Sequence, residues 1–300
     1  MGRTIVGVLG EILTAIVTPF KADGSLHLER FRELARHLVD NGSDGLVVTG
    51  TTGEAPTLTD DERFALYAAA VDEVGDRATV VAGTGTYSTA HSIHLTERAD
   101  EIGVDGFLIV TPYYSMPPQR AIVAHVAAIA ETTAKPIVVY NIPARVVRNI
   151  EPETIAVLAE VENVAAVKQA NPDLDQARRI VESGLALYAG DDDLLLPFLE
   201  LGGTGGICVH THVVGSQVAE LVRRFRADDV EGARALDEEL RASIELLRVT
   251  TNPIAIKAAL GLVGWDVGGP RLPLLEATDD EREAVRGCLE RLGLLQAAAA

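Results

Sequence analysis

Short apolar runs alternate with longer amphipathic segments along most of the chain. Eight runs are rich in Val, Ile or Leu, and they lie at Leu13–Val17, Gly45–Val48, Thr79–Ala82, Gly106–Val110, Ile137–Tyr140, Val164–Val167, Leu185–Tyr188 and Gly206–Val209. None alternates cleanly between apolar and polar positions, which is typical of parallel strands buried on both faces. We therefore predict eight buried strands, each followed by a helix.

The segments between the runs have the apolar spacing of amphipathic helices. Leu28–Val39 and Asp60–Val74 are two of them, and Thr59 and Glu62 have the spacing of a capping box ahead of the second. Eight strand–helix units in about 210 residues predict an α/β fold, a (β/α)8 TIM barrel over residues 1–227. An open doubly wound sheet is the alternative, although no GxGxxG or Walker-type loop follows the first run.

The apolar runs end near Val222, and the rest of the chain has helical spacing. Asp229–Val249, Thr251–Gly264 and Asp279–Leu295 are the predicted helical segments. We expect them to form a C-terminal helical region over residues 228–300, appended to the barrel.

Composition narrows the possible partners. The chain has 26 basic and 44 acidic residues and a net charge of −18, which argues against a nucleic-acid-binding surface. Cys208 and Cys288 form no CxxC pair, so neither a zinc site nor a disulfide framework is indicated, and a reducing cytoplasm fits best. The apolar segment Ile5–Phe20 is interrupted by Glu11 and is too short to span a membrane, so we expect neither export nor a membrane anchor.

In a (β/α)8 barrel the active site gathers where the strands end, and Lys168 directly follows the run Val164–Val167. An amine at the apolar mouth of a barrel is desolvated, which lowers its pKa. A neutral amine attacks carbonyl groups and forms Schiff bases. The alternative is a structural ion pair, for example with Asp191.

Tyr140 ends the neighbouring fifth run, and Arg145 lies five residues beyond it. The Tyr140 phenol is placed to exchange a proton with a group at Lys168, although a hydroxyl that only faces water is the alternative. Arg145 could bind a carboxylate through two parallel hydrogen bonds, but a lone Arg is more often solvated.

The turn Gly50-Thr51-Thr52-Gly53 follows the second run and offers successive backbone N–H groups and two hydroxyls to an anion. A tight turn whose glycines adopt positive φ is the alternative. His210 and His212 follow the eighth run, but no nearby Asp or Glu in the sequence completes a ligand set. We therefore predict structural roles for both histidines, and neither a metal nor a cofactor.

Further motifs recur in the same order. The complete set is Gly50–Glu54, Thr111–Tyr114, Tyr140–Arg145, Val167–Lys168, Gly190–Asp192, Gly205–Ile207, Asn252–Ile254 and Arg271–Leu274. In this order and spacing they resemble the dihydrodipicolinate synthase / N-acetylneuraminate lyase family of pyruvate-dependent class I aldolases.

The resemblance implies a lyase that condenses pyruvate with L-aspartate 4-semialdehyde to 4-hydroxy-tetrahydrodipicolinate, in lysine and diaminopimelate biosynthesis. It implies that Lys168 forms the imine with pyruvate and that Tyr140 exchanges protons at the imine carbon. Thr51 and Tyr114 would complete a proton relay, with Tyr114 crossing into a neighbouring subunit of a homotetramer built as a dimer of dimers. The residues implied in substrate binding are Thr52, Arg145, Ile207 and Gly190.

Two observations favour a synthase within this family: Tyr114 is present, and Arg145 lies in a Pro-x-Arg context. The chain departs from the family pattern at Val146, Val147 and Gln169. One alternative is a related aldolase or dehydratase acting on a 2-keto-3-deoxy sugar acid. Another is a non-catalytic barrel that binds a keto acid.

Lysine-inhibited members of this family carry polar residues, including His, a few positions after the Gly-Thr-Thr-Gly-Glu motif. Here the corresponding region contains Asp60, Arg63, Tyr87 and His91. We therefore predict that lysine inhibits this protein weakly or not at all.

Overall fold

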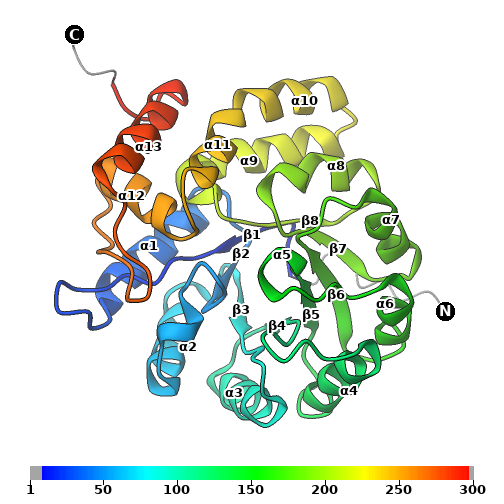
Figure 1. The fold of residues 1–300 in the computed structure, drawn as a ribbon. Coiled ribbons are helices and arrows are strands. Elements are labelled where there is room, and N and C mark those ends of the chain that lie inside the picture. Colours follow the sequence, from blue (N-terminus) through cyan, green and yellow to red (C-terminus); the bar gives the residue numbers. More distant parts are fainter. Residues whose placement is uncertain (1–8, 297–300) are drawn as a thin grey trace.

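A computed structural model describes residues 9–296, in which eight strands close into a barrel (Figure 1). The strands are β1 (Ile12–Ala15), β2 (Gly45–Val48), β3 (Thr79–Gly83), β4 (Gly106–Val110), β5 (Ile137–Asn141), β6 (Val164–Gln169), β7 (Ala186–Ala189) and β8 (Gly205–Cys208). All neighbours pair in parallel, and β1 pairs with β8. This pairing confirms the predicted TIM barrel and excludes the open sheet.

Helices connect successive strands and surround the barrel (Figure 1). They are α1 (Leu28–Asp40), α2 (Asp60–Val74), α3 (Thr89–Ile102), α4 (Gln119–Ala130), α5 (Pro143–Val146), α6 (Pro152–Leu158), α7 (Leu174–Glu182), α8 (Leu195–Glu200) and α9 (Thr211–Arg226). Short 3-10 turns, η1 (Ala55–Thr57) and η2 (Asp192–Leu194), precede α2 and α8. The predicted capping box begins α2: Thr59 accepts the N–H of Glu62, and the Glu62 carboxylate accepts the N–H of Thr59.

Barrel closure requires a close approach of β8 to the residue before β1. The N–H of Gly206 donates to the carbonyl oxygen of Glu11 at 2.9 Å, and a Cβ atom on Gly205 would overlap that oxygen. The Tyr188 hydroxyl donates to the carbonyl of Gly10 at 2.8 Å across the same seam. Gly205 is therefore needed because no side chain fits between the first and last strands.

The observed strand ends lie within two residues of the predicted ones. The prediction of one helix over Asp229–Val249 is wrong: the structure has α10 (Val230–Glu239) and α11 (Arg241–Arg248), separated at Leu240. The Leu240 carbonyl accepts both the N–H and the hydroxyl of Ser243, at 2.8 and 2.6 Å. This three-residue turn satisfies the carbonyl locally, and the chain changes direction there.

Two more helices complete the C-terminal region, α12 (Ile254–Leu262) and α13 (Asp279–Arg291). α12 packs against α9 and α13, so this region covers one side of the barrel (Figure 1). The predicted boundary at 227/228 falls in the turn between α9 and α10. Positions 5–8 of the apolar N-terminal segment lie outside the described residues.

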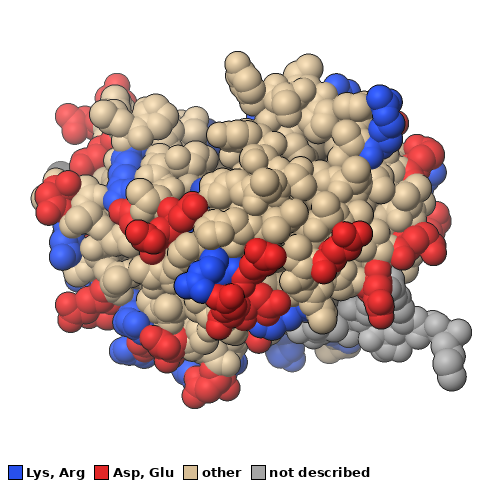
Figure 2. Space-filling view, turned by 90° about the horizontal axis from the view of Figure 1, so that it is seen from below, with Lys and Arg blue, Asp and Glu red and all other residues tan. Residues whose placement is uncertain are grey.

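No helix within residues 9–296 is long and apolar enough to cross a membrane. Figure 2 views the side of the molecule that carries α3 and α4. Acidic and basic side chains alternate across its lower part, while the upper middle of the view shows a broad uncharged area. Large apolar side chains are exposed on the loops after β3, β4 and β5: Tyr87, Tyr114, Met116 and Val147.

Candidate active site

Lys168 and Tyr140 lie side by side at the carboxyl end of the barrel. They are register partners on β6 and β5, and the Lys168 Nζ lies 4.4 Å from the centroid of the Tyr140 ring. Both side chains line a cavity of about 780 Å³ at the mouth of the barrel. Parallel strands place their ends at one edge, which explains why these two residues, 28 positions apart, meet there.

The Lys168 amine is buried and forms no ion pair among the described residues. Burial lowers its pKa from 10.5 to about 8, although the nearby charges of Asp192, Cys208 and Asp191 oppose the change. At pH 7 about one molecule in ten therefore carries a neutral amine at Lys168. The predicted alternative, an ion pair with Asp191, is not formed.

Tyr140 is buried, so its hydroxyl does not simply face water. Burial raises the pKa of the phenol well above its usual range, and a hydrogen bond with the Thr51 side chain opposes that rise. Tyr140 is consequently a neutral phenol at physiological pH, able both to donate and to accept a proton.

The turn after β2 brings Thr51 and Thr52 to the same cavity. The Thr52 hydroxyl accepts a hydrogen bond from the Asn252 side-chain amide at 3.0 Å. Positive φ occurs at Thr49 and Glu54 rather than at the glycines of this turn. Gly53 is needed for space instead, because a Cβ atom there would lie 3.0 Å from the Thr49 Cα.

The remaining predicted residues divide into three groups. Arg145 on α5 and Gly190 after β7 line the cavity with Lys168. Ile207 is fully buried within β8 and is not among the residues that line the cavity. Tyr114 points into solvent, with 95% of its surface exposed, so the structure does not bring it to the site of its own chain.

The sequence predictions missed the C-terminal wall of the site. Side chains of α11 and the loop that follows it line the cavity: Ile244, Leu247, Arg248, Thr250, Thr251 and Asn252. Asn252 could have been predicted as a site residue, because it lies within the motif Asn252–Ile254. For the α11 residues, helical spacing alone gives no sign that one face covers a barrel mouth.

Glu54 joins the turn after β2 to the C-terminal region. Its carboxylate lies 2.6 Å from the Lys257 Nζ in a fully buried pair, and it accepts the N–H of Arg271 at 2.9 Å. Together with the contact of Asn252 to Thr52, this pair fixes the turn from behind.

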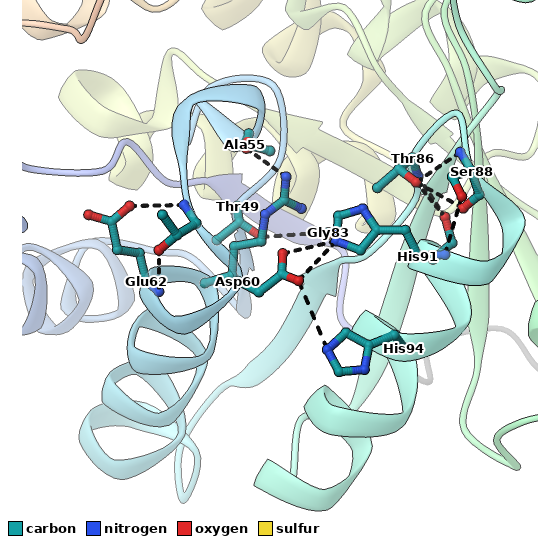
Figure 3. A network of polar contacts seen from close by, with 12 residues as sticks. Thr49, Ala55, Asp60, Glu62, Gly83, Thr86, Ser88, His91 and His94 are labelled. Atoms are coloured by element: carbon teal, nitrogen blue, oxygen red, sulfur yellow. Dashed lines mark hydrogen bonds and ion pairs between the residues drawn. The ribbon is translucent and has the colours of Figure 1, made fainter.

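A second cavity, of about 330 Å³, adjoins the first and contains Tyr113 and Arg63. The Arg63 guanidinium donates to the carbonyl of Ala55 at 2.6 Å. Figure 3 shows the Asp60 carboxylate between His91, at 2.9 Å, and His94, at 3.9 Å. Of the residues named in the feedback prediction, Asp60 and His91 are thus paired with each other, whereas Arg63 bonds to the Ala55 carbonyl and the Tyr87 ring packs against Tyr113.

The model of the dihydrodipicolinate synthetase family matches residues 8–292 of the chain. The chain belongs to this family. It is 50% identical to the 4-hydroxy-tetrahydrodipicolinate synthase of Moorella thermoacetica over 95% of this chain and 99% of that protein.

Solved structures of the family superpose closely on this chain. The dihydrodipicolinate synthase from Cyanidioschyzon merolae, determined with lysine bound, is 39% identical with a TM-score of 0.94, covering 96% of this chain and all of the other. The dihydrodipicolinate synthase from Thermotoga maritima is 40% identical with a TM-score of 0.93, over 96% of this chain and all of the other.

Proposed function

We propose that this protein is a 4-hydroxy-tetrahydrodipicolinate synthase, a lyase that condenses pyruvate with L-aspartate 4-semialdehyde through a Schiff base. The observation that carries the proposal is the Lys168 amine, which is buried beside the Tyr140 phenol in a cavity and has no ion-pair partner in the described part of the chain. The name of its relatives, at up to 50% identity over nearly the full chain, supports the same substrates. Such an enzyme would act in lysine biosynthesis in the cytoplasm.

The first half-reaction forms an enamine. The neutral Lys168 amine attacks C2 of pyruvate, Tyr140 protonates the departing hydroxyl as water, and an imine remains. The Thr51 and Thr52 backbone N–H groups and the Thr52 hydroxyl hold the pyruvate carboxylate. The Tyr140 phenolate then takes a proton from C3, which gives the enamine, with the imine nitrogen as the electron sink.

The second half-reaction joins the substrates. The enamine carbon attacks the aldehyde carbon of the semialdehyde, whose carboxylate Arg145 binds in the cavity that Gly190 also lines. The Tyr140 phenol protonates the resulting alkoxide. The amino group of the adduct then attacks the imine carbon. The ring closes and the Lys168 amine is released with the proton that Tyr140 and Thr51 relay.

Trapping the imine tests this assignment. The protein is incubated with pyruvate and borohydride, and the intact mass and the modified peptide are determined. We expect one pyruvate-sized adduct, on Lys168. A folded protein without the adduct would favour the non-catalytic barrel. An adduct without turnover of the semialdehyde, but with release of pyruvate from a 2-keto-3-deoxy sugar acid, would favour the related aldolase.

Tyr114 is assigned to the site of a second copy of the chain. It is exposed, as are Tyr87, Met116 and Val147 on the neighbouring loops at the carboxyl end of the barrel, and exposed large apolar side chains are typical of protein interfaces. This patch and the broad uncharged area in Figure 2 support a dimer, and two dimers would form the family's tetramer.

Mixing two variants tests the role of Tyr114. Lys168→Arg and Tyr114→Ala are each expected to be nearly inactive alone. A hybrid dimer contains one site with both an intact Lys168 and a Tyr114 from the other copy, so mixing by mild dissociation should restore activity. Absence of restoration, with hybrid formation verified by native mass spectrometry, would place Tyr114 outside catalysis in the partner.

The feedback prediction also stands as a proposal. The Asp60 carboxylate is already paired with His91 and lies near His94, which leaves it less free to bind an added cationic ligand. Activity assayed in millimolar lysine should be almost unchanged, whereas halved activity would contradict this expectation.

A further inference from the structure

Three potential metal ligands meet at the wall of the catalytic cavity, which Asp192 itself lines. Asp192 comes from η2, Cys208 from the end of β8 and His210 from the turn before α9. All three are buried, and their ligand atoms lie within 4.8 Å of one another. In the sequence no acidic residue lies near His210, but barrel closure brings Asp192 to it from 18 positions away.

The hydrogen bonds of His210 define which of its nitrogens carries a proton. The Ser243 hydroxyl donates its hydrogen to the Leu240 carbonyl at 2.6 Å, so its oxygen accepts from His210 Nδ1 at 3.0 Å. In the neutral ring, Nε2 therefore carries a lone pair. This atom is buried and has no hydrogen-bond partner among the described residues, and it faces Asp192 Oδ1 at 3.5 Å.

His212, two residues later, provides the contrast. Its Nδ1 donates to the Val209 carbonyl at 2.7 Å, and its Nε2 accepts the N–H of Val17 at 3.2 Å. Both nitrogens of His212 are satisfied, in agreement with the predicted structural role. His210 has one nitrogen that the fold leaves unused.

The distance between His210 and Asp192 fits a shared cation better than a hydrogen bond. Hydrogen bonds of this kind span about 2.7–3.2 Å. Two ligands of one tetrahedral zinc ion, each about 2.0–2.1 Å from the metal, are about 3.3 Å apart. Without a cation or an added proton, a lone pair and a carboxylate would face each other in a buried site, which is costly.

We propose that Asp192, Cys208 and His210 form a binding site for a soft divalent cation such as Zn²⁺. A thiolate and an imidazole select zinc over magnesium or calcium. One thiolate and one carboxylate balance the charge of the ion, and a fourth position remains for water. Binding replaces the thiol proton of Cys208 with a Zn–S bond and releases that proton to solvent.

Hydrogen bonds from the surrounding residues hold two of the three ligands in place. Asp192 Oδ1 accepts the N–H groups of Val209 and His210, both at 2.7 Å, which fixes the carboxylate. The chain of His210, Ser243 and the Leu240 carbonyl orients the imidazole, as partners behind metal-binding histidines do.

Metal incorporation tests the proposal. The full-length protein is produced in medium supplemented with Zn²⁺ or Co²⁺, and is also refolded with either ion so that burial does not prevent entry. Metal content is measured after dialysis, and the cobalt form is examined for a thiolate-to-cobalt charge-transfer band. We expect one tightly held ion per chain and that band.

Variants identify the ligands. Cys208→Ser and His210→Gln should lose the ion and the band while keeping the native circular dichroism spectrum. Ser243→Ala should weaken binding about 10–100-fold. Cys288→Ser is the matched control, because Cys288 is the only other cysteine and is also buried, and it should bind as the wild type does. No uptake by either route, or an unchanged band in Cys208→Ser, would overturn the proposal.

Discussion

Lys168 and Lys257 are both buried amines over an aromatic ring, but they lie in different regions of the molecule. Their Nζ atoms lie 4.4 Å from the ring centroid of Tyr140 and 4.5 Å from that of Phe20. Behind the turn after β2, Lys257 pairs with Glu54 at 2.6 Å. At the barrel mouth, Lys168 has no ion pair among the described residues.

This difference shows that burial alone does not produce a nucleophile. Burial lowers the pKa of both lysines, and the Glu54 carboxylate opposes the change at Lys257. The charged form of Lys257 is therefore held by a partner, and its pair joins two regions of the chain. Lys168 has no such partner within residues 9–296, and its amine is free to react with a carbonyl carbon.

Substituting Lys168 should have the largest effect. Lys168→Arg keeps a positive charge but cannot form an imine, so kcat/KM should fall at least about 10³-fold and the borohydride adduct should disappear. Lys135→Arg is the matched control, because Lys135 forms a partly exposed pair with Asp100 at 2.6 Å. An adduct that persists in Lys168→Arg would transfer the chemistry to another lysine.

Removing the phenol beside Lys168 should have the next largest effect. Tyr140→Phe makes the ring next to Lys168 resemble that next to Lys257, and losing the proton donor should lower kcat about 10²–10⁴-fold. The control is Tyr188→Phe, which removes a buried hydroxyl bonded to Gly10 instead. Equal losses in steady-state assays of both variants would mean that the phenol acts only through packing.

Replacing each lysine with methionine should change stability in opposite directions. Lys257→Met leaves the Glu54 carboxylate buried without a counter-charge and should destabilise the fold by about 3–5 kcal/mol. Lys168→Met removes an unpaired buried amine and should stabilise it by about 0.5–2 kcal/mol. Guanidinium unfolding measures both. If the free energy of unfolding changed with the same sign in both variants, the paired and unpaired lysines would not differ as proposed.

We expect the smallest effect from changing the pH, which alters both the rate of imine trapping and the stability of the fold. Imine formation needs the neutral amine, so the trapping rate with pyruvate should fall about tenfold for each pH unit below about 8. The native pKa of Lys168 lies below its unfolded value of 10.5, so the unfolded chain binds more protons between about pH 8 and 10.5. Wild-type stability should rise over that window, and the advantage of Lys168→Met should shrink. A trapping rate that does not change over the roughly two pH units below about 8 would contradict the lowered pKa of Lys168.

Much of the barrel was predictable because buried parallel strands are nearly continuous apolar runs. Lys168, Tyr140 and Thr51 were predictable because each lies at the end of such a run or within three residues after it, and strand ends meet at one edge. Leu240 was not predictable as a break. Its apolar side chain continues the helical spacing, and only the hydrogen bonds of its carbonyl to Ser243 divide the helix.

Local sequence patterns specify the eight strands, the edge at which the chemistry gathers and the family to which the chain belongs. Tertiary structure decided which buried lysine is paired, because Glu54 and Lys257 are 203 positions apart and meet only when the C-terminal helices pack on the barrel. It also decided that Asp192 faces His210 and that Asn252 supports Thr52. The physical reason is that local patterns record periodicity and burial, whereas ion pairs and ligand sets depend on contacts between distant segments.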